Sequence, residues 1–342
     1  MKCLVAMSGG VDSSVCAKLV KDSGAQATGC YMILNEYVTD EGAKDAKAIS
    51  DKIGMDFITA NFVEEFKCKV TDCFTKTYLE GKTPNPCVEC NKYIKFGALL
   101  DYAVKEGFDT LATGHYANIE ESNGRFLLKK AKDVSKDQSY FLYGLSQEVL
   151  SKVRFPLGGY TKDEIRQIAE ENGFINAHKK DSQDICFVPD GNYAEVIKKK
   201  AEILPPRGKF VLKDKTVLGE NKGIYNYTYG QRKGLGISAD RPLYVIDINP
   251  DTNEVVLGDD ADLYQREVIV SNVNWIMADK REGSFRASAR LRYRHKEQPA
   301  TVEILTDSRI RIIYDEPQRA ATRGQSAVVY DGDYVVCGGI IE

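Results

Sequence analysis

Residues 2–14 read KCLVAMSGGVDSS, an apolar run that passes directly into a turn with two glycines and ends on two serines. We expect a buried strand over 2–7, a turn at 8–10, and a helix from about Ser13 to Asp22. Glycines let the backbone come close to an anion, and a helix N-terminus offers unpaired N–H groups. The stretch therefore predicts a phosphate-binding loop, the alternative being an ordinary tight turn with a helix cap.

The alternation of apolar runs with helical stretches continues beyond this loop. Strands are predicted at 27–34, 55–62 and 109–117, and helices at 42–54, 63–80 and 91–106. A loop at 81–90, GKTPNPCVEC, separates the last two helices. Strands that alternate with helices predict an α/β fold, here a doubly wound parallel sheet over residues 1–200.

The pattern changes after Pro205-Pro206, where helical periodicity gives way to short runs rich in β-branched residues. Examples are PLYVIDI, EVIVSNV, RIRIIY and SAVVYDGDYVVCGGII. Short strands with turn signals between them are typical of small β domains. We expect a small central β domain over 201–265 and a C-terminal β-barrel over 266–342.

Composition limits the class of protein. A chain of 342 residues is long enough for two or three domains, and 43% hydrophobic with 28% charged residues is ordinary for a globular protein. It contains neither a signal-peptide pattern nor an apolar run of about 20 residues, so we expect a cytoplasmic protein with no membrane association. Nine cysteines, an odd number, predict metal or redox chemistry at a few of them rather than a disulfide framework.

Charge is distributed unevenly along the chain. Between Lys280 and Arg323 there are eleven Lys and Arg against six Asp and Glu, although the whole chain carries a net charge of −3. A basic segment on an otherwise acidic protein is compatible with a polyanion bound at one end. A solvated surface face would give the same count.

The loop at 8–14, SGGVDSS, has neither the GxxxxGK[ST] nor the GxGxxG pattern. It resembles the pyrophosphate loop of ATP pyrophosphatases, which split ATP to AMP and pyrophosphate while they adenylate a substrate oxygen. Asp12 beside phosphate would require a cation between them, and Mg²⁺ prefers such oxygen ligands. We therefore expect ATP and Mg²⁺ at this loop.

Two cysteine-bearing stretches are candidates for redox chemistry. TPNPCVEC (83–90) contains two prolines, which predict that Cys87 and Cys90 are held in a defined loop. DSQDICF (181–187) carries Cys186. A CxxC pair is compatible with half of a zinc site, but a second CxxC and histidines at finger spacing are missing from the sequence.

Several motifs together resemble the bacterial tRNA-specific 2-thiouridylases over almost the whole chain. They are MSGGVDSS (7–14), TPNPxxxCNxxIKF (83–96), ATGHYA (112–117), KDQSYFL (136–142), DSQDICF (181–187), YGQRKGLGI (229–237), LRYRH (291–295) and GQSAVVYDG (324–332). The resemblance implies ATP-dependent 2-thiolation of the wobble uridine of tRNA. The C2 oxygen would be adenylated, and sulfur would then replace it.

The resemblance also implies roles for individual residues. Cys186 would receive a persulfide from a sulfur-carrier protein or other sulfide donor, and Cys90 would be its catalytic partner, with a disulfide Cys90–Cys186 able to form. Asp12 would act in the ATP reaction. ATP contacts would be Ala6, Met7, Ser8, Gly9, Gly10, Val11, Asp12, Ser13, Met32 and Gly114. Contacts to tRNA would be Asn85, Pro86, Cys87, His115, Lys136, Asp137, Gln138, Arg292, Tyr293 and Gln325.

Two departures from the family pattern leave alternatives open. Cys87 stands where many relatives have an aspartate, and the segment after Met32 is short, which puts adenine contacts there in doubt. Three thiolates at Cys87, Cys90 and Cys186 would suit an iron–sulfur cluster with one free iron site. That cluster is the alternative to a persulfide on Cys186.

Two other functions share part of these features. Another ATP-pyrophosphatase-fold synthetase, of the argininosuccinate or NAD synthesis type, would keep the nucleotide loop but would not need the cysteines. A non-catalytic tRNA-binding protein would explain the basic segment but would leave SGGVDSS without a role.

Overall fold

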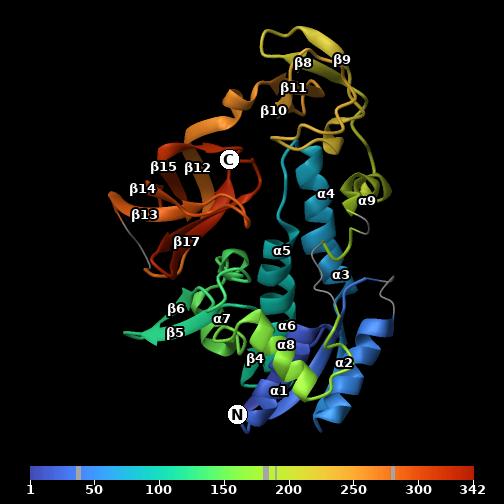
Figure 1. Ribbon diagram of the computed structural model, residues 1–342, viewed down its shortest axis with the longest axis vertical. Helices are drawn as coiled ribbons and strands as arrows, with labels where there is room; N and C mark the ends of the chain where they lie inside the picture. Colours follow the sequence, from blue (N-terminus) through green and yellow to red (C-terminus); the bar gives the residue numbers. More distant parts are fainter. Residues whose placement is uncertain (36–39, 180–184, 189–190, 279–281) are drawn as a thin grey trace.

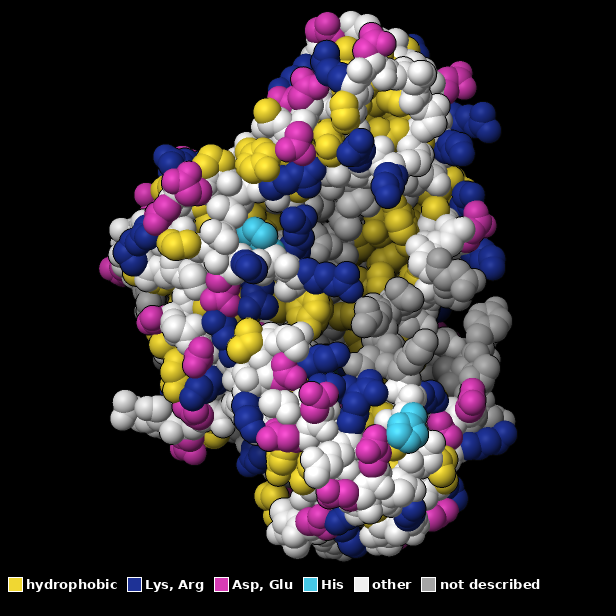
Figure 2. Space-filling model, viewed as in Figure 1, with side chains coloured by type: hydrophobic (Ala, Val, Ile, Leu, Met, Phe, Trp, Pro, Cys, Tyr) yellow, Lys and Arg dark blue, Asp and Glu magenta, His cyan; other side chains and the backbone are white. Residues whose placement is uncertain are grey.

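The computed structural model describes residues 1–35, 40–179, 185–188, 191–278 and 282–342. It contains an α/β domain, a small β domain and a β-barrel, arranged around a central hollow (Figure 1, Figure 2). In these described ranges no helix is long and apolar enough to cross a membrane.

The N-terminal sheet is parallel throughout, with strand order β3-β2-β1-β4-β7. Its strands are β1 (Lys2–Ala6), β2 (Gln26–Ile33), β3 (Asp56–Asn61), β4 (Thr110–Ala112) and β7 (Val153–Arg154). Alternate residues of β1 enter two different cores, Leu4 and Ala6 on one face and Cys3 and Val5 on the other. Apolar residues cover both faces of the sheet, as parallel sheets require, and the predicted doubly wound α/β fold is confirmed.

The helices of this part of the chain lie around the sheet, except that α4 and α9 extend from it toward the central domain (Figure 1). They are α1 (Val11–Asp22), α2 (Asp40–Lys52), α3 (Val63–Phe66), η1 (Lys67–Thr71), α4 (Asp72–Leu79), α5 (Pro86–Glu89), η2 (Cys90–Ala98), α6 (Leu99–Lys105), η3 (Ser139–Phe141), α7 (Gln147–Lys152), α8 (Lys162–Glu171) and α9 (Tyr193–Lys200). The central strand β1 has β2 on one side and β4 on the other, so the chain reverses its direction of winding there. Ligands of open α/β sheets bind at the carboxyl ends of strands at such a point.

The expected loop at 81–90 is wrong in its second half. A helix begins at Pro86 and continues without a break through α5, the π-helical segment η2 and α6. Proline suits the first position of a helix because its fixed φ is already helical and the missing N–H would have no partner there. Cys87 and Cys90 therefore lie in the first turns of a helix instead of in an extended loop.

The central domain has a four-stranded sheet of order β10-β11-β8-β9. Its elements are β8 (Lys209–Leu212), β9 (Val217–Glu220), η5 (Ile224–Asn226), β10 (Tyr244–Asn249), β11 (Glu254–Gly258) and η6 (Asp260–Leu263). A separate apolar core, which includes Phe210, Ile224 and Val255, lies on this sheet.

The C-terminal strands close into the predicted barrel because β12 pairs with both β15 and β17. The barrel strands are β12 (Tyr264–Trp275), β13 (Ser284–Arg290), β14 (Gln298–Thr306), β15 (Arg309–Arg319), β16 (Ser326–Asp331) and β17 (Tyr334–Ile341). A hairpin of the N-terminal domain, β5 (Asn118–Ser122) and β6 (Arg125–Lys129), extends the same sheet through one pairing of β6 with β17. This hairpin lies beside the barrel in Figure 1 and was not predicted from the sequence.

Candidate active site

The glycine-serine loop lies between β1 and α1, as predicted. Gly9 has φ +76°, which favours glycine, and Gly10 precedes the first turn of α1. The Ser13 hydroxyl accepts a hydrogen bond from the Ser8 N–H (3.1 Å) and donates one to the Gly10 carbonyl (3.0 Å). The serine side chain therefore stabilises a tight turn at a helix N-terminus, which is a ready site for an anion.

The chain that follows β4 packs directly against this loop. A Cβ at Gly114 would lie 2.9 Å from the Asp12 carbonyl carbon and 3.0 Å from the Ser13 nitrogen. Only glycine fits such an approach of two backbones. Met32, half-buried near the carboxyl end of β2, lies at the same edge of the sheet. The structure therefore brings the expected ATP residues of three strands to one sheet edge.

Asp12 is paired with residues that the sequence analysis missed. Its Oδ1 accepts hydrogen bonds from the Lys162 ammonium and the Tyr116 hydroxyl, both at 2.7 Å. The Lys162 side chain is only 8% exposed, so a buried cation stands beside the candidate phosphate loop. Asn176 supports the same loop by donating to the Gly9 carbonyl and the Ser14 hydroxyl, both at 2.9 Å.

This arrangement bears on the expected magnesium ion. Among the described residues, no three His, Cys, Asp or Glu side chains lie close enough together to hold a metal ion. Asp12 is an oxygen ligand that Mg²⁺ favours, and Mg²⁺ is commonly held by one or two carboxylates plus substrate phosphates and water. Asp12 therefore fits magnesium that arrives with a nucleotide, and that ion would neutralise phosphate charge.

The three candidate cysteines are free thiols that affect one another electrostatically. Cys90 is buried, whereas Cys87 and Cys186 are exposed at their outer surfaces. Desolvation, reinforced by Cys90 and Cys87, raises the pKa of Cys186 to about 11. Burial also raises the pKa of Cys87 and of Cys90. Burial therefore disfavours the thiolate form of all three cysteines.

Lys95 is the cation shared by these thiols. Its charge lowers the pKa of Cys87, Cys90 and Cys186, against the larger effect of burial. Its ammonium also lies 3.4 Å from His115 Nε2. An ammonium only donates, so Nε2 is the acceptor and His115 Nδ1 donates to the Thr113 hydroxyl at 2.7 Å. In the sequence, Lys95 is part of the 83–96 motif, as the lysine of IKF.

His115 is buried, which limits how it acts. Its ring contacts Phe96 and Phe155, with centroids 5.6 and 5.8 Å away. Burial, assisted by Lys95, lowers its pKa well below the ordinary value, so the ring is neutral at physiological pH. A contact of His115 with tRNA stays a prediction; here it supports Lys95.

Comparison with known proteins identifies the family. The family model described as a tRNA methyl transferase HUP domain matches residues 1–190, its PRC-barrel domain 195–259, and an aminomethyltransferase β-barrel domain 265–341. The chain is 49% identical to tRNA-specific 2-thiouridylase MnmA of Clostridioides difficile (strain 630), covering 100% of this chain and 98% of the relative. It is 47% identical to MnmA 1 of Clostridium botulinum (strain Okra / Type B1), covering 99% and 97%. The chain belongs to the tRNA-specific 2-thiouridylase family.

Solved structures resemble this chain only in part. The structure of a 4-thiouridine synthetase–RNA complex with bound ATP has a TM-score of 0.38 and 18% identity, covering 58% of this chain and 50% of that one. NMN synthetase from Francisella tularensis has a TM-score of 0.34 and 16% identity, covering 53% and 66%.

Two of the expected tRNA contacts, Asp137 and Gln138, form hydrogen bonds within the protein. Asp137 is 1% exposed and accepts hydrogen bonds from the Ala131 N–H (3.1 Å) and the Ser139 hydroxyl (2.8 Å). Gln138 accepts from the Tyr116 N–H at 2.9 Å. Both side chains shape the turn that presents the half-buried Lys136, and their own contact with tRNA stays a prediction.

The barrel loop 291–297 carries cations that are open to solvent. Arg292, Arg294 and Lys296 are exposed, and within the described part of the chain no ion pair with a carboxylate is recorded for them. Most other barrel arginines are paired, as Arg286 is with Asp315 at 2.7 Å. Figure 2 shows Lys and Arg gathered around the hollow between the three domains. Of the basic residues that give the 280–323 segment its excess charge, those in loop 291–297 are therefore the ones best placed to bind an anion.

Tyr293 and Gln325 contact the protein itself. The Tyr293 ring packs on Phe141, with centroids 4.5 Å apart. The Gln325 amide donates to the Thr83 carbonyl at 3.0 Å and the Pro84 carbonyl at 2.9 Å, immediately before Asn85 and Pro86. Spacing in the sequence gave no signal for a contact between residues 242 positions apart.

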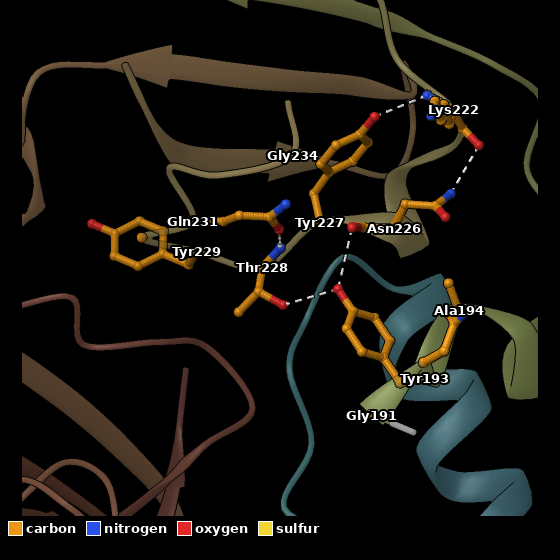
Figure 3. Close-up of a pocket in the computed structure, with 12 residues that line it drawn as sticks. Gly191, Tyr193, Ala194, Lys222, Asn226, Tyr227, Thr228, Tyr229, Gln231 and Gly234 are labelled. Carbon is orange, nitrogen blue, oxygen red and sulfur yellow. Dashed lines mark hydrogen bonds between the residues drawn. The ribbon is translucent and has the colours of Figure 1, made fainter. Parts of the chain in front are cut away.

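A pocket of about 590 Å³ lies elsewhere in the thiouridylase, between α9 and the 222–234 segment of the central domain. Figure 3 shows the Tyr193 hydroxyl directed from α9 toward Thr228 and Asn226, while Tyr229 points away from it. The YGQRKG motif supplies Tyr229, Gly230, Gln231 and Gly234 to its lining. Neither Asp12 nor the cysteines line it, so it is separate from the candidate active site.

Proposed function

We propose that this chain is an ATP-dependent tRNA-uridine 2-sulfurtransferase that thiolates the wobble uridine. The observation that carries the proposal is the match to 2-thiouridylases over the whole chain, which includes the nucleotide loop, the thiols and the barrel. ATP would bind at residues 6–13, Met32 and Gly114, and tRNA along the hollow and the 291–297 loop. A sulfur-carrier protein or another sulfide donor would supply sulfur.

Activation of the base explains why the thiols need a nucleotide loop. The C2 oxygen of uridine is a poor leaving group, and its attack on the α-phosphate of ATP would release pyrophosphate and leave AMP attached. Phosphate transfer needs positioning and charge stabilisation, which the Gly9–Gly10 turn, the α1 N-terminus and Lys162 supply. Lys162 would leave Asp12 for the phosphates as the metal-bound nucleotide arrives.

Sulfur transfer would use Cys186 and Cys90 in succession. The terminal sulfur of a Cys186 persulfide bonds to C2, and AMP departs with the former C2 oxygen. The Cys90 thiolate then attacks the Cys186 sulfur, so that 2-thiouridine leaves and a Cys90–Cys186 disulfide forms. A cellular thiol reductant restores both cysteines. Lys95 favours loss of the proton from each thiol.

The iron–sulfur alternative requires Cys87, Cys90 and Cys186 to converge as ligands. In the described part of the chain they do not form a metal-ligand set. Anaerobic purification with iron and sulfide quantitation tests this alternative. Stoichiometric iron and sulfide in fully active protein would favour the cluster mechanism over the persulfide mechanism.

Two assays test the proposed function. AMP release from ATP, measured with and without unmodified tRNA, should depend on tRNA, and mass spectrometry of digested tRNA should detect 2-thiouridine at the wobble position. AMP release that depends on a small amino acid or nicotinate derivative would indicate a synthetase. Binding of tRNA without AMP release under any condition would indicate a non-catalytic protein.

A further inference from the structure

The extended segment before α5 is attached to the barrel by backbone contacts. The Thr83 N–H donates to the Arg323 carbonyl at 2.9 Å. Gly324 has φ +86°, and a Cβ there would lie 3.0 Å from both the Lys82 Cβ and the Thr83 oxygen. A residue with a side chain would be strained by the backbone conformation and crowded by this contact. The backbone of residues 82–83 therefore packs directly against that of residues 323–324.

Gln325 completes the attachment. Its amide nitrogen faces two carbonyl oxygens, of Thr83 (3.0 Å) and Pro84 (2.9 Å). Only the NH₂ end of the side chain can donate to both, so this orientation follows from the partners. Pro84 has no N–H of its own, and its carbonyl is held from the barrel side.

The next residue extends the contact to the KDQSYFL segment. Ser326 is fully buried, its carbonyl accepts from the Tyr140 hydroxyl at 2.9 Å, and its own hydroxyl lies 3.1 Å from that of Tyr143. One end of β16 therefore holds both segments that are expected to contact tRNA.

We propose that Gln325 is a positioning residue that holds residues 83–87 in the conformation that admits the target uridine, rather than a residue that binds tRNA itself. The barrel then contributes to sulfur transfer by shaping the catalytic domain, in addition to its contact with RNA. This inference rests on the proposed function for the identity of the base.

The test uses Gln325→Glu in the full-length protein. Glutamate has nearly the same shape, but its carboxylate would face two carbonyl oxygens without a proton to donate. Gln325→Met removes the donor without adding charge and serves if the first variant fails to fold. Gln167→Glu makes the same chemical change on the exposed side of α8 and is the matched control.

Hydrogen–deuterium exchange of the tRNA-free protein is the first measurement. Loss of about one hydrogen bond's stabilisation should speed exchange over 80–90 at least about fivefold. In Gln325→Glu, exchange over 298–306 within the barrel should be unchanged. In the control Gln167→Glu, exchange over 80–90 should be the same as in the parent. This measurement involves neither tRNA nor ATP, so it holds even if the parent protein proves unable to thiolate tRNA.

Affinity for tRNA and the single-turnover thiolation rate are measured next. We expect the tRNA affinity of Gln325→Glu to stay within about twofold of the parent. The single-turnover rate at saturating tRNA should fall at least about tenfold, because a misplaced base is attacked slowly. Parent-like exchange over 80–90 would overturn the inference. So would tRNA affinity reduced by tenfold or more with the saturated rate unchanged.

Discussion

Asp12 and Lys162 are 150 positions apart, yet their side chains meet in the nucleotide loop. A buried ammonium would be costly on its own, and the Asp12 carboxylate compensates its charge until phosphates can do so. The Tyr116 hydroxyl and Asn176 fix the same loop through further hydrogen bonds. Individual charges at this site are therefore useful for nucleotide chemistry only because neighbouring side chains hold them in place.

Replacing Asp12 with asparagine should reduce tRNA-dependent AMP formation at least about a hundredfold, because the carboxylate that would anchor phosphate-bound magnesium is lost. The change also leaves Lys162 without its anionic partner, which should lower the free energy of unfolding by about 1–3 kcal/mol. The double variant Asp12→Asn, Lys162→Met removes both charges and controls for that effect. Turnover of the single variant within tenfold of the parent would contradict the assignment of this loop to ATP.

His115 should make stability depend on pH on the acid side. Its folded-state pKa lies well below the unfolded value, so the unfolded chain binds the extra proton first. The free energy of unfolding is therefore fully present above about pH 6.5 and falls as the pH decreases toward the folded pKa, by at most about 1.4 kcal/mol per pH unit. Denaturant titrations from pH 7.5 to 5 should show this slope in the parent. The slope should be shallower in His115→Gln, and equal slopes would show that another group is responsible.

The helix that begins at Pro86 determines where the thiols are placed. Cys87 and Cys90 lie in its first turns, and Lys95 lies farther along it in η2. A helix presents residues at fixed angular positions, so this one element sets the positions of two thiols and their shared cation. The nucleotide loop lies on a separate element, α1, and the two reactions should be separable by mutation.

Cys90→Ala and Cys186→Ala should each abolish 2-thiouridine formation while tRNA-dependent AMP release continues at a substantial rate. The two thiols carry and release sulfur, whereas adenylation uses the loop at 8–14. Cys87→Asp should keep substantial activity in air if residue 87 orients the base. Loss of AMP release in either alanine variant would show that the sites are not independent, and Cys3→Ala, a buried thiol in β1, is the control for thiol loss.

The exposed cations Arg292, Arg294 and Lys296 should make the affinity for tRNA depend on salt concentration. Arg292→Ala is expected to weaken tRNA binding and to reduce the slope of log affinity against log salt by about one unit per lost phosphate contact, with ATP binding unchanged. Filter binding across a salt series measures both quantities. Arg286→Ala, whose guanidinium is already paired with Asp315, is the matched control. An Arg292 variant with the parent's affinity and slope would place the RNA surface elsewhere.

A charge network that is buried at Asp137 and Arg290 joins the barrel to the catalytic domain. Asp137 and Lys130 of the first domain meet Arg290 and Glu297 of the barrel, with Arg290–Glu297 at 2.7 Å and Lys130–Glu297 at 2.9 Å. The Arg290 guanidinium also lies 5.2 Å from the Tyr330 ring centre. The shared β5–β6 hairpin and the Gln325 contacts reinforce this junction. The hollow between the domains thus has walls whose relative positions are set by buried contacts.

Arg290→Met should destabilise the protein by about 3–5 kcal/mol, because Asp137 and Glu297 lose their buried partner. Arg286→Met breaks an exposed pair of similar geometry and should cost about 0–1 kcal/mol. Chemical denaturation followed by tryptophan fluorescence reports on the barrel through Trp275 in β12. Equal losses in the two variants would mean that burial of the network contributes little to stability.

The sequence by itself determined the parallel-sheet domain, the glycine turn that follows its first strand and the terminal barrel, and it predicted a phosphate site at that turn and reactive thiols at three cysteines. Apolar periodicity, glycine turns and cysteine placement depend on local backbone preference and burial, which can be read along the chain. The helix start at Pro86 was within reach of the same local rules, since proline is favoured at the first helical position.

Only the tertiary structure decided which distant groups share a site. Lys162, Tyr116 and Asn176 reach the loop at 8–14 from 104 to 167 positions away, and Gln325 reaches Thr83 across 242. Such pairings leave no periodic signal, because chain topology, and not local conformation, brings these side chains together. The pairing of the β5–β6 hairpin with the barrel has the same origin: an edge strand can pair with any exposed edge, and packing of the whole molecule selects β17.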